Sequence, residues 1–268
     1  MPSRSYPDAA RAMNPPGAAA SALGVARCVA TVLLLVVSLV PLGLAALVPL
    51  RWRGERLAMW VPGLISRSFL AISGLRLDVR HAEALRDLRG FAFFNHVSHL
   101  DIPVLLAVRP FRFLATAGVK KIPVIGWMAR AVGTVFVHRG NEESRAEARL
   151  HLHRAFRRSP TPIALAPEGG VNPDADLRPF RHGAFEVARD AQAPVLLVAL
   201  EFEPRGPAGW LEGESLLHAY WRLAARTEPT VAHVVALPPP RPVTGPPAEA
   251  SDAAEVRIRS ALAALRAR

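Results

Sequence analysis

Cysteine and lysine are almost absent from this chain. Its one cysteine, Cys28, excludes an internal disulfide and any metal site built from several thiolates. Cys28 also lies at the edge of an apolar segment, which makes it a poor candidate nucleophile. The only two lysines are Lys120 and Lys121, so the net charge of +11 comes mostly from arginine. Two interpretations of this charge remain open: a codon bias towards alanine, arginine and proline, or selection for binding to anionic lipid.

Several sequence signatures are also missing. The chain has no phosphate-binding or dinucleotide-binding glycine pattern, no zinc-ligand spacing, no helix-turn-helix signature and no stripe of basic and aromatic residues. These absences argue against nucleic acid as a partner. The nine histidines are scattered, and His151 and His153 would point to different faces of a helix, so no metal site is predicted. No internal repeat is present, and 268 residues suit one sizeable domain with an appendage.

The N-terminal part contains the longest apolar run. Residues 1–24 are rich in proline, alanine and serine and are expected to be disordered. No residue between Arg27 and Arg51 is charged. A helix over this run would reach about 34 Å, enough to cross a hydrocarbon core of about 30 Å. Three interpretations remain: a spanning helix, a hairpin that enters one leaflet and breaks near Pro41–Gly43, and a cleaved signal peptide.

Arginines flank this run unequally. Arg51, Arg53 and Arg56 follow it closely, a bias that favours a catalytic domain on the cytoplasmic side of the inner or plasma membrane. A second apolar segment, Leu57–Ile72, has helical spacing and suits either a core helix or an interfacial helix. We therefore expect residues 25–73 to form a membrane-associated helical segment.

Strand-like and helical segments alternate beyond residue 75. This order predicts an α/β domain over residues 74–240, in which helices cover both faces of a mixed β-sheet. Residues 241–268 are expected to be a proline-rich linker, centred on Pro238–Pro247, and a C-terminal helix. The predicted strands are 75–79, 91–94, 113–115, 134–137, 163–166, 195–200 and 231–236, and the predicted helices are 102–108, 124–131, 142–157, 184–190, 211–225 and 253–266.

A histidine and an aspartate follow the second predicted strand. His96 and Asp101 are five residues apart, which on one helix would place them about 500° apart, on different faces. They meet only if the chain turns between the end of a strand and the start of a helix. Ser98 is placed to cap that helix, with Asp101 three residues later, and Pro103 is tolerated only near a helix start. The simplest alternative is that Asp101 merely caps the helix.

Such a pair has a definite chemistry. A neutral imidazole takes a proton from an alcohol, and a carboxylate on its other nitrogen fixes the tautomer. Because no catalytic serine is needed, the hydroxyl of the substrate can attack a thioester directly. His99 is a competing base, and Ser98 is an alternative nucleophile for a lipid hydrolase, although the chain has no Gly-x-Ser-x-Gly motif.

Further motifs follow in order. With the segment 95–101 they resemble the motifs of the glycerolipid acyltransferases, the family of 1-acyl-glycerol-3-phosphate acyltransferases, over roughly residues 75–240. Any one motif is weak evidence, whereas the ordered set is specific. The segments that carry the resemblance are Asn95–Asp101, Lys120–Trp127, Gly133–Arg139, Pro167–Gly169, Phe180–Ala184 and Ala193–Val198.

The resemblance implies a function. It implies transfer of a fatty acyl group to the free hydroxyl of 1-acyl-glycerol-3-phosphate in phospholipid biosynthesis, with acyl-CoA or acyl carrier protein as co-substrate and no metal or other cofactor. His96 is then the general base and Asp101 its orienting carboxylate. Three further implied roles are phosphate binding by Arg139, shaping of the acceptor site by Glu168 and Gly169, and contact of Arg181 with anionic groups.

Two departures from the family pattern leave the acceptor open. The common third motif is Glu-Gly-Thr-Arg, whereas this chain has Gly170 and Val171 in place of the last two residues. Leu197 replaces a second proline of the fourth motif. The missing arginine makes another lysophospholipid or lyso-lipid an alternative acceptor. A lipid hydrolase and a non-catalytic membrane-binding or nucleic-acid-binding protein are the remaining classes.

Overall fold

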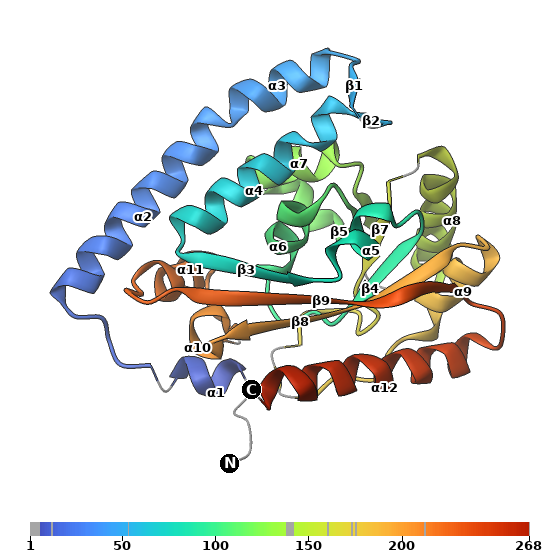
Figure 1. Cartoon of the computed structure of the whole chain (residues 1–268). Helices are drawn as coiled ribbons and strands as arrows, with labels where there is room; N and C mark the ends of the chain where they lie inside the picture. The colour runs from blue at the N-terminus through green and yellow to red at the C-terminus, as the bar shows by residue number, and fades with distance from the viewer. Residues whose placement is uncertain are drawn as a thin grey trace.

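The computed structural model of the chain describes residues 6–11, 13–52, 54–137, 142–159, 161–172, 174, 176–211 and 213–267. Seven strands form one mixed sheet in the order β3-β9-β8-β4-β7-β5-β6, which confirms the predicted fold class (Figure 1). Neighbouring strands are parallel, except that β8 and β9 are antiparallel. The strands are β3 (Leu75–Arg80), β4 (Phe91–Phe94), β5 (Arg112–Thr116), β6 (Val135–Val137), β7 (Ile163–Leu165), β8 (Pro194–Glu203) and β9 (Thr230–Pro242).

Helices cover both faces of this sheet. On one face lie α4 (Val61–Ile72) and α6 (Asp101–Val108), and on the other lie α9 (His182–Asp190) and α12 (Pro247–Arg266) (Figure 1). Side chains of β8 alternate between the two resulting cores, because successive strand residues point to opposite faces. One core contains Leu196, Val198 and Leu200, and the other contains Val195, Leu197 and Ala199. The other elements of the domain are α5 (Ala82–Asp87), η2 (Ala117–Lys121), α7 (Ile125–Ala131), α8 (Glu142–Arg158), α10 (Arg205–Ala208) and α11 (Leu216–Ala224).

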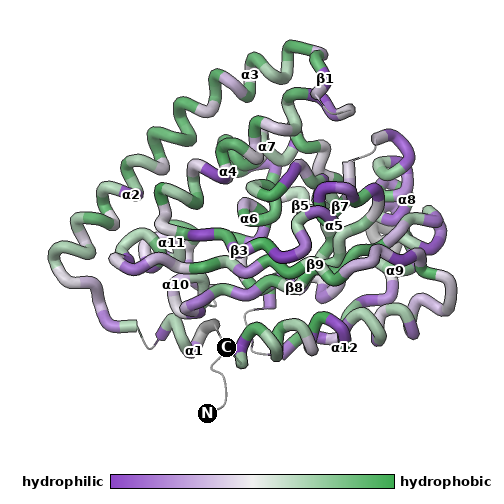
Figure 2. Tube along the Cα trace, viewed as in Figure 1, coloured by the Kyte–Doolittle hydropathy of each residue, from purple (hydrophilic) through white to green (hydrophobic). Residues whose placement is uncertain are grey.

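The N-terminal apolar run forms a long helical segment. It comprises α2 (Ala18–Val37) and α3 (Leu39–Leu47), and within the described residues it alone has the length and composition to cross a membrane. Figure 2 shows this segment as mainly hydrophobic. Its outward face carries a set of exposed aliphatic side chains, namely Val29, Leu33, Val36, Val40, Leu44 and Leu47.

This segment does not fold back near Pro41–Gly43. α3 continues in the direction of α2, and the chain reverses only at the short hairpin β1 (Arg51–Trp52) and β2 (Glu55–Arg56), followed by the turn η1 (Leu57–Met59) (Figure 1). α4 then runs back beside α2. The inner face of α2 packs on the domain, where Thr31 Oγ1 lies 2.6 Å from Tyr220 Oη.

Two segments differ from what composition suggests. Residues 1–24 include α1 (Tyr6–Arg11) and the start of α2. α1 packs against α10, where a Cβ on Gly206 would lie only 2.9 Å from Ala9 O. Residues 238–242 extend β9, and Arg241 and Pro242 pair with β8, so the linker begins later than expected. Beyond Val235, β9 has lost its pairing with β3, and a strand with one open side tolerates proline.

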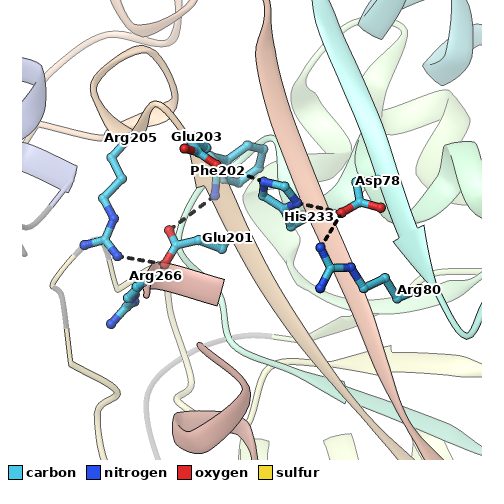
Figure 3. Close-up of polar contacts among 8 residues, drawn as sticks. All are labelled: Asp78, Arg80, Glu201, Phe202, Glu203, Arg205, His233 and Arg266. Atoms are coloured by element: carbon cyan, nitrogen blue, oxygen red, sulfur yellow. Dashed lines mark hydrogen bonds and ion pairs between the residues drawn. The ribbon is translucent and has the colours of Figure 1, made fainter. Parts of the chain in front are cut away.

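Polar side chains join the strands to the C-terminal helix at the end of β8. Glu201 accepts hydrogen bonds from Arg205 at 2.9 Å and from Arg266, near the end of α12, at 2.6 Å (Figure 3). On the neighbouring strands, His233 lies between Asp78 and Glu203 (Figure 3). These contacts fasten α12 and the outer strands to each other.

Candidate active site

The His96–Asp101 segment lies at the carboxyl end of β4. β4 is fully buried between two parallel neighbours, β7 and β8. The chain turns after Phe94, and α6 begins at Asp101. The turn brings the two side chains together, with His96 Nδ1 2.7 Å from Asp101 Oδ2. The chain therefore makes the turn that a contact between His96 and Asp101 requires.

Asp101 is enclosed by the turn that it closes. Its side chain is fully buried, and its Oδ2 also accepts hydrogen bonds from Val97 N at 2.9 Å and Ser98 N at 3.1 Å. Burial raises the pKa of Asp101, and the hydrogen bonds from His96, Ser98 and Val97 oppose that rise. These donors hold the carboxylate in one orientation, which in turn fixes the imidazole ring.

His96 presents its other nitrogen outward. Its side chain is 18% exposed, and Nε2 has no hydrogen-bond partner among the described residues. The ring stands edge-on to Phe94, with 5.7 Å between ring centroids. If Nδ1 donates to Asp101, the neutral ring leaves the Nε2 lone pair free to accept a proton. The arrangement therefore suits a general base.

The alternative groups in the turn are less suited to catalysis. Ser98 is buried, and its Oγ accepts from Leu100 N at 3.2 Å. The sequence predicted that Ser98 caps α6. It does not, because Leu100 is the residue immediately before the helix. Burial, together with the charges of His96 and Arg222, lowers the pKa of His99 to about 4. His99 packs edge-on against Trp210, with ring centroids 4.9 Å apart.

The turn after β7 lies against the same histidine. Glu168 Oε1 accepts a hydrogen bond from His96 N at 3.0 Å. Gly169 has φ +81°, and a Cβ there would lie 2.5 Å from Arg181 Nε. The positive φ favours glycine here, and any larger residue would also displace the side chain of Arg181. Burial raises the pKa of Glu168, while hydrogen bonds from His96, Asn172 and Arg178 lower it.

Arg181 is the residue immediately before α9, beside the turn that follows β7. Its backbone N donates to Pro167 O at 2.9 Å, and its exposed side chain has no ion pair or hydrogen bond within the described part of the chain. The preceding residue, Phe180, is held by Ser251 and Glu255 of α12. The backbone of Arg181 is thus held in place, and its exposed side chain is available to an anionic group.

The structure brings together five of the six predicted site residues: His96, Asp101, Glu168, Gly169 and Arg181. Arg139 lies outside the described residues. β6 ends at Val137 on the same edge of the sheet as β4 and β7, because these strands are parallel. In the described part of the chain, no three metal-ligating side chains converge.

Two asparagines join the site without having been predicted as site residues. Asn95 exchanges hydrogen bonds with the backbone of Leu200, both at 2.8 Å, and so ties the end of β4 to β8. Asn172, in the loop after β7, bonds to both His96 and Glu168. Asn95 is adjacent to the histidine, which is a signal for its role, whereas the composition around Asn172 indicates only a turn.

Comparison with known proteins finds similarity to acyltransferases. Residues 76–201 match the model of the family described as Acyltransferase. The chain is 34% identical over 152 residues to a lyso-ornithine lipid O-acyltransferase of Pseudomonas aeruginosa, covering 54% of this chain and 57% of that protein. It is 35% identical over 108 residues to a 1-acyl-sn-glycerol-3-phosphate acyltransferase of Neisseria gonorrhoeae, covering 40% of this chain and 42% of the relative.

A solved structure has the same fold. The 1-acyl-sn-glycerophosphate acyltransferase of Thermotoga maritima superposes with a TM-score of 0.64 at 19% identity, covering 90% of this chain and 98% of that chain. The aligned parts of the two curated relatives span less than two thirds of their length. The site geometry and the ordered motifs agree with the match of residues 76–201 to the family described as Acyltransferase.

Proposed function

We propose that this protein is a membrane-associated O-acyltransferase that moves a fatty acyl group from acyl-CoA or acyl carrier protein to the hydroxyl of 1-acyl-glycerol-3-phosphate. The observation that carries the proposal is the His96–Asp101 pair with its available Nε2, set in an acyltransferase-family domain. No separate cofactor is required for this chemistry.

In the proposed reaction His96 first accepts a proton and later donates it. His96 Nε2 takes the proton of the acceptor hydroxyl as its oxygen attacks the thioester carbonyl. Asp101 stabilises the imidazolium that forms, without itself becoming protonated. When the tetrahedral intermediate collapses, the carbon–sulfur bond breaks and the thiolate leaves with the proton from the imidazolium. No acyl-enzyme forms, in keeping with the buried position of Ser98.

A second acceptor class is favoured by a specific observation. Gly170 and Val171 replace the Thr-Arg of the common third motif, so one phosphate-binding cation is missing. The Pseudomonas aeruginosa relative is named for a lyso-ornithine lipid rather than a lysophosphatidate. Another lyso-lipid is therefore the alternative acceptor, and Arg181 and Arg139 are the candidate cations for either headgroup.

We also propose that the α2–α3 segment attaches the protein to the membrane, with the domain on the cytoplasmic side. The outward face of the segment is apolar, whereas its inner face packs on the domain. A helix fastened along its length to a soluble domain fits an interfacial position better than a spanning one. The cytoplasmic placement rests on the cations after the segment, such as Arg51 and Arg56.

An acceptor panel tests the function directly. Purified protein is mixed with one of several lyso-lipids and a labelled acyl donor, either acyl-CoA or acylated acyl carrier protein. Products are identified by mass spectrometry. The panel contains 1-acyl-glycerol-3-phosphate, lysophosphatidylethanolamine, lysophosphatidylcholine and lyso-ornithine lipid. Acylation of the first is expected. Acylation of another lyso-lipid alone selects the alternative, and fatty acid release without any acceptor indicates a hydrolase.

The acceptor cations are tested with a matched control. Arg181→Ala and Arg139→Ala should each raise the acceptor KM by roughly ten- to a hundred-fold, the cost of losing a charge-assisted hydrogen bond. The donor KM should change little. Arg178→Ala is the control, because its side chain lies in the same region but pairs with Asp174 at 3.7 Å. A rise in donor KM alone would place these arginines at the thioester end.

A further inference from the structure

The loop between β7 and α9 holds the backbone of His96. Asn172, which is 1% exposed, donates its backbone N–H to His96 O at 2.5 Å. Glu168 Oε1 accepts from His96 N at 3.0 Å. The carbonyl and the N–H of His96 are therefore both held by a loop from another part of the sheet, while Asp101 holds its ring. The catalytic residue is thus constrained at three points.

The side chain of Asn172 joins these constraints. Its Nδ2 donates to Glu168 Oε2 at 2.6 Å and to Asp176 O at 3.0 Å, and its Oδ1 accepts from Asp174 N at 3.3 Å. Glu168 Oε2 also accepts from Arg178 N at 3.1 Å. Both oxygens of Glu168 are therefore occupied by protein donors, and its side chain faces inward. The orientation of Glu168 on His96 depends on the amide of Asn172.

We propose that Asn172 is a positioning residue: through Glu168 it holds the peptide of His96 so that Nε2 points at the acceptor hydroxyl. This inference rests on the proposed acyl transfer. A side chain that acts through the base should affect kcat rather than acceptor KM, because it touches neither substrate. Misplacement of a reacting group by about 1 Å costs roughly a hundred-fold in rate.

Asn172→Asp gives the sharpest test, because it changes one N–H₂ group to oxygen at constant shape. It sets two buried carboxylates at the distance of the present 2.6 Å contact. Both cannot stay ionised there, so at high pH they repel and Glu168 leaves its position. At lower pH the pair shares one proton and the contact is restored. The ratio of variant to wild-type kcat should rise at least ten-fold as pH falls from 9 to 6.

The surrounding charges set the controls. The groups facing this contact are His96 on the β4–α6 turn, Asp176 and Arg178 in the loop itself, and Arg181 across Gly169. Dividing the variant rate by the wild-type rate at each pH removes only the pH dependence that the two proteins share. Asp174→Asn changes one charge in the same loop at an exposed side chain and should leave the ratio flat.

A second variant guards against misfolding. Glu168→Gln sets N–H groups against Asn172 Nδ2 and Arg178 N, so it should lower kcat by a similar factor. It creates no carboxylate pair, and its loss should not recover at low pH. Thermal unfolding of each variant, followed by circular dichroism, checks that the fold is retained.

The outcomes separate the inference from the proposed function. An active wild type with an unchanged Asn172→Asp ratio at every pH overturns the inference alone, as does a loss confined to acceptor KM. A wild type inactive on every lyso-lipid overturns the proposed function instead. In that case NMR of ¹³C-labelled histidine still decides: the pH dependence of the His96 ring signals should change in Asn172→Asp and not in Asp174→Asn. Unchanged signals in both would overturn the inference.

Discussion

Two histidine–aspartate pairs lie in different parts of this sheet. At the carboxyl end of β4, His96 Nδ1 is 2.7 Å from Asp101 Oδ2, and between β9 and β3, His233 Nδ1 is 2.9 Å from Asp78 Oδ2 (Figure 3). Judged by this one contact, the pairs are nearly equivalent. Their surroundings differ in ways that decide what each can do.

The second ring nitrogen is the first difference. His233 Nε2 lies 3.3 Å from Glu203 Oε2, so both of its nitrogens face carboxylates and neither is left for a substrate. His96 Nε2 has no such partner in the described part of the chain. A histidine–aspartate contact therefore identifies a candidate base only when the remote nitrogen is available.

The carboxylate is the second difference. Asp101 is fully buried, and burial raises its pKa, whereas Asp78 is 38% exposed and the hydrogen bond from His233 lowers its pKa. Arg80 also binds Asp78 at 3.0 Å. Exposed ion pairs of this kind contribute little to stability. The pair at β3 and β9 is thus a partly exposed structural contact, and the pair at β4 is the candidate site.

The largest expected effect comes from removing each histidine in turn. His96→Ala should lower kcat/KM for acyl transfer by about 10³- to 10⁴-fold, since the general base is lost. His233→Ala should retain activity within a few-fold. Steady-state kinetics on folded protein measure both. Equal effects from the two substitutions would abolish the distinction drawn between the pairs.

Substitution of the two aspartates should distinguish the two pairs in the same way as substitution of the two histidines. Asp101→Asn should lower kcat by about 10²- to 10³-fold, because the ring is no longer fixed in the useful tautomer. Asp78→Asn should leave kcat unchanged and alter only acid stability. Because the pKa of Asp78 is lowered in the fold, its contribution is present above the ordinary value of 3.8 and is lost as pH falls through the lowered one. Unfolding midpoints between pH 2 and 6 measure this effect, and a large kcat loss in Asp78→Asn would contradict the comparison.

A third histidine, His99, gives a further prediction, because burial lowers its pKa. The pKa of His99 is about 4 in the fold against 6.5 for an ordinary histidine, so the unfolded chain binds its proton first. Stability should therefore fall by about 3 kcal/mol as pH drops from 6.5 to 4 and change no further below that. His99→Phe should flatten this slope, measured by unfolding midpoints in detergent, whereas His151→Gln, on an exposed part of α8, should not. A slope that persists in His99→Phe would show that another group causes it.

The sequence predicted the parts of this structure that depend on local pattern. The strands and helices of the domain follow from alternation and spacing. The sequence also indicated a turn after Phe94 that would allow His96 to reach Asp101, and the contact itself is seen in the structure. The roles of Arg139, Glu168, Gly169 and Arg181 came from the family resemblance and stay predictions. Asn172 could not be found in this way, because its importance depends on a contact between loops 76 residues apart in the chain.

Other differences between the sequence predictions and the structure also arise from contacts that composition does not reveal. Composition suggests disorder before residue 24, but docking on α10 holds α1 in place. Composition also suggests that 238–242 is a linker, but pairing with β8 makes it a strand. Ser98 has the residue type of a helix cap, yet Asp101 makes the hydrogen bonds that close the turn. In the first two cases a tertiary contact overrides a local preference, and in the third a neighbouring side chain in the same turn does so.

The strand order has a consequence for how the protein is made. β3 pairs with β9, whose residues are synthesised about 155 positions later, so β3 stays without its partner strand until β9 has been made. At about 5–20 residues per second, that delay is roughly 8–30 s on a ribosome. The apolar α2–α3 segment is made before this interval, when α11, which packs on α2, does not yet exist. Early capture of this segment by a bilayer would protect the nascent chain from aggregation during the delay.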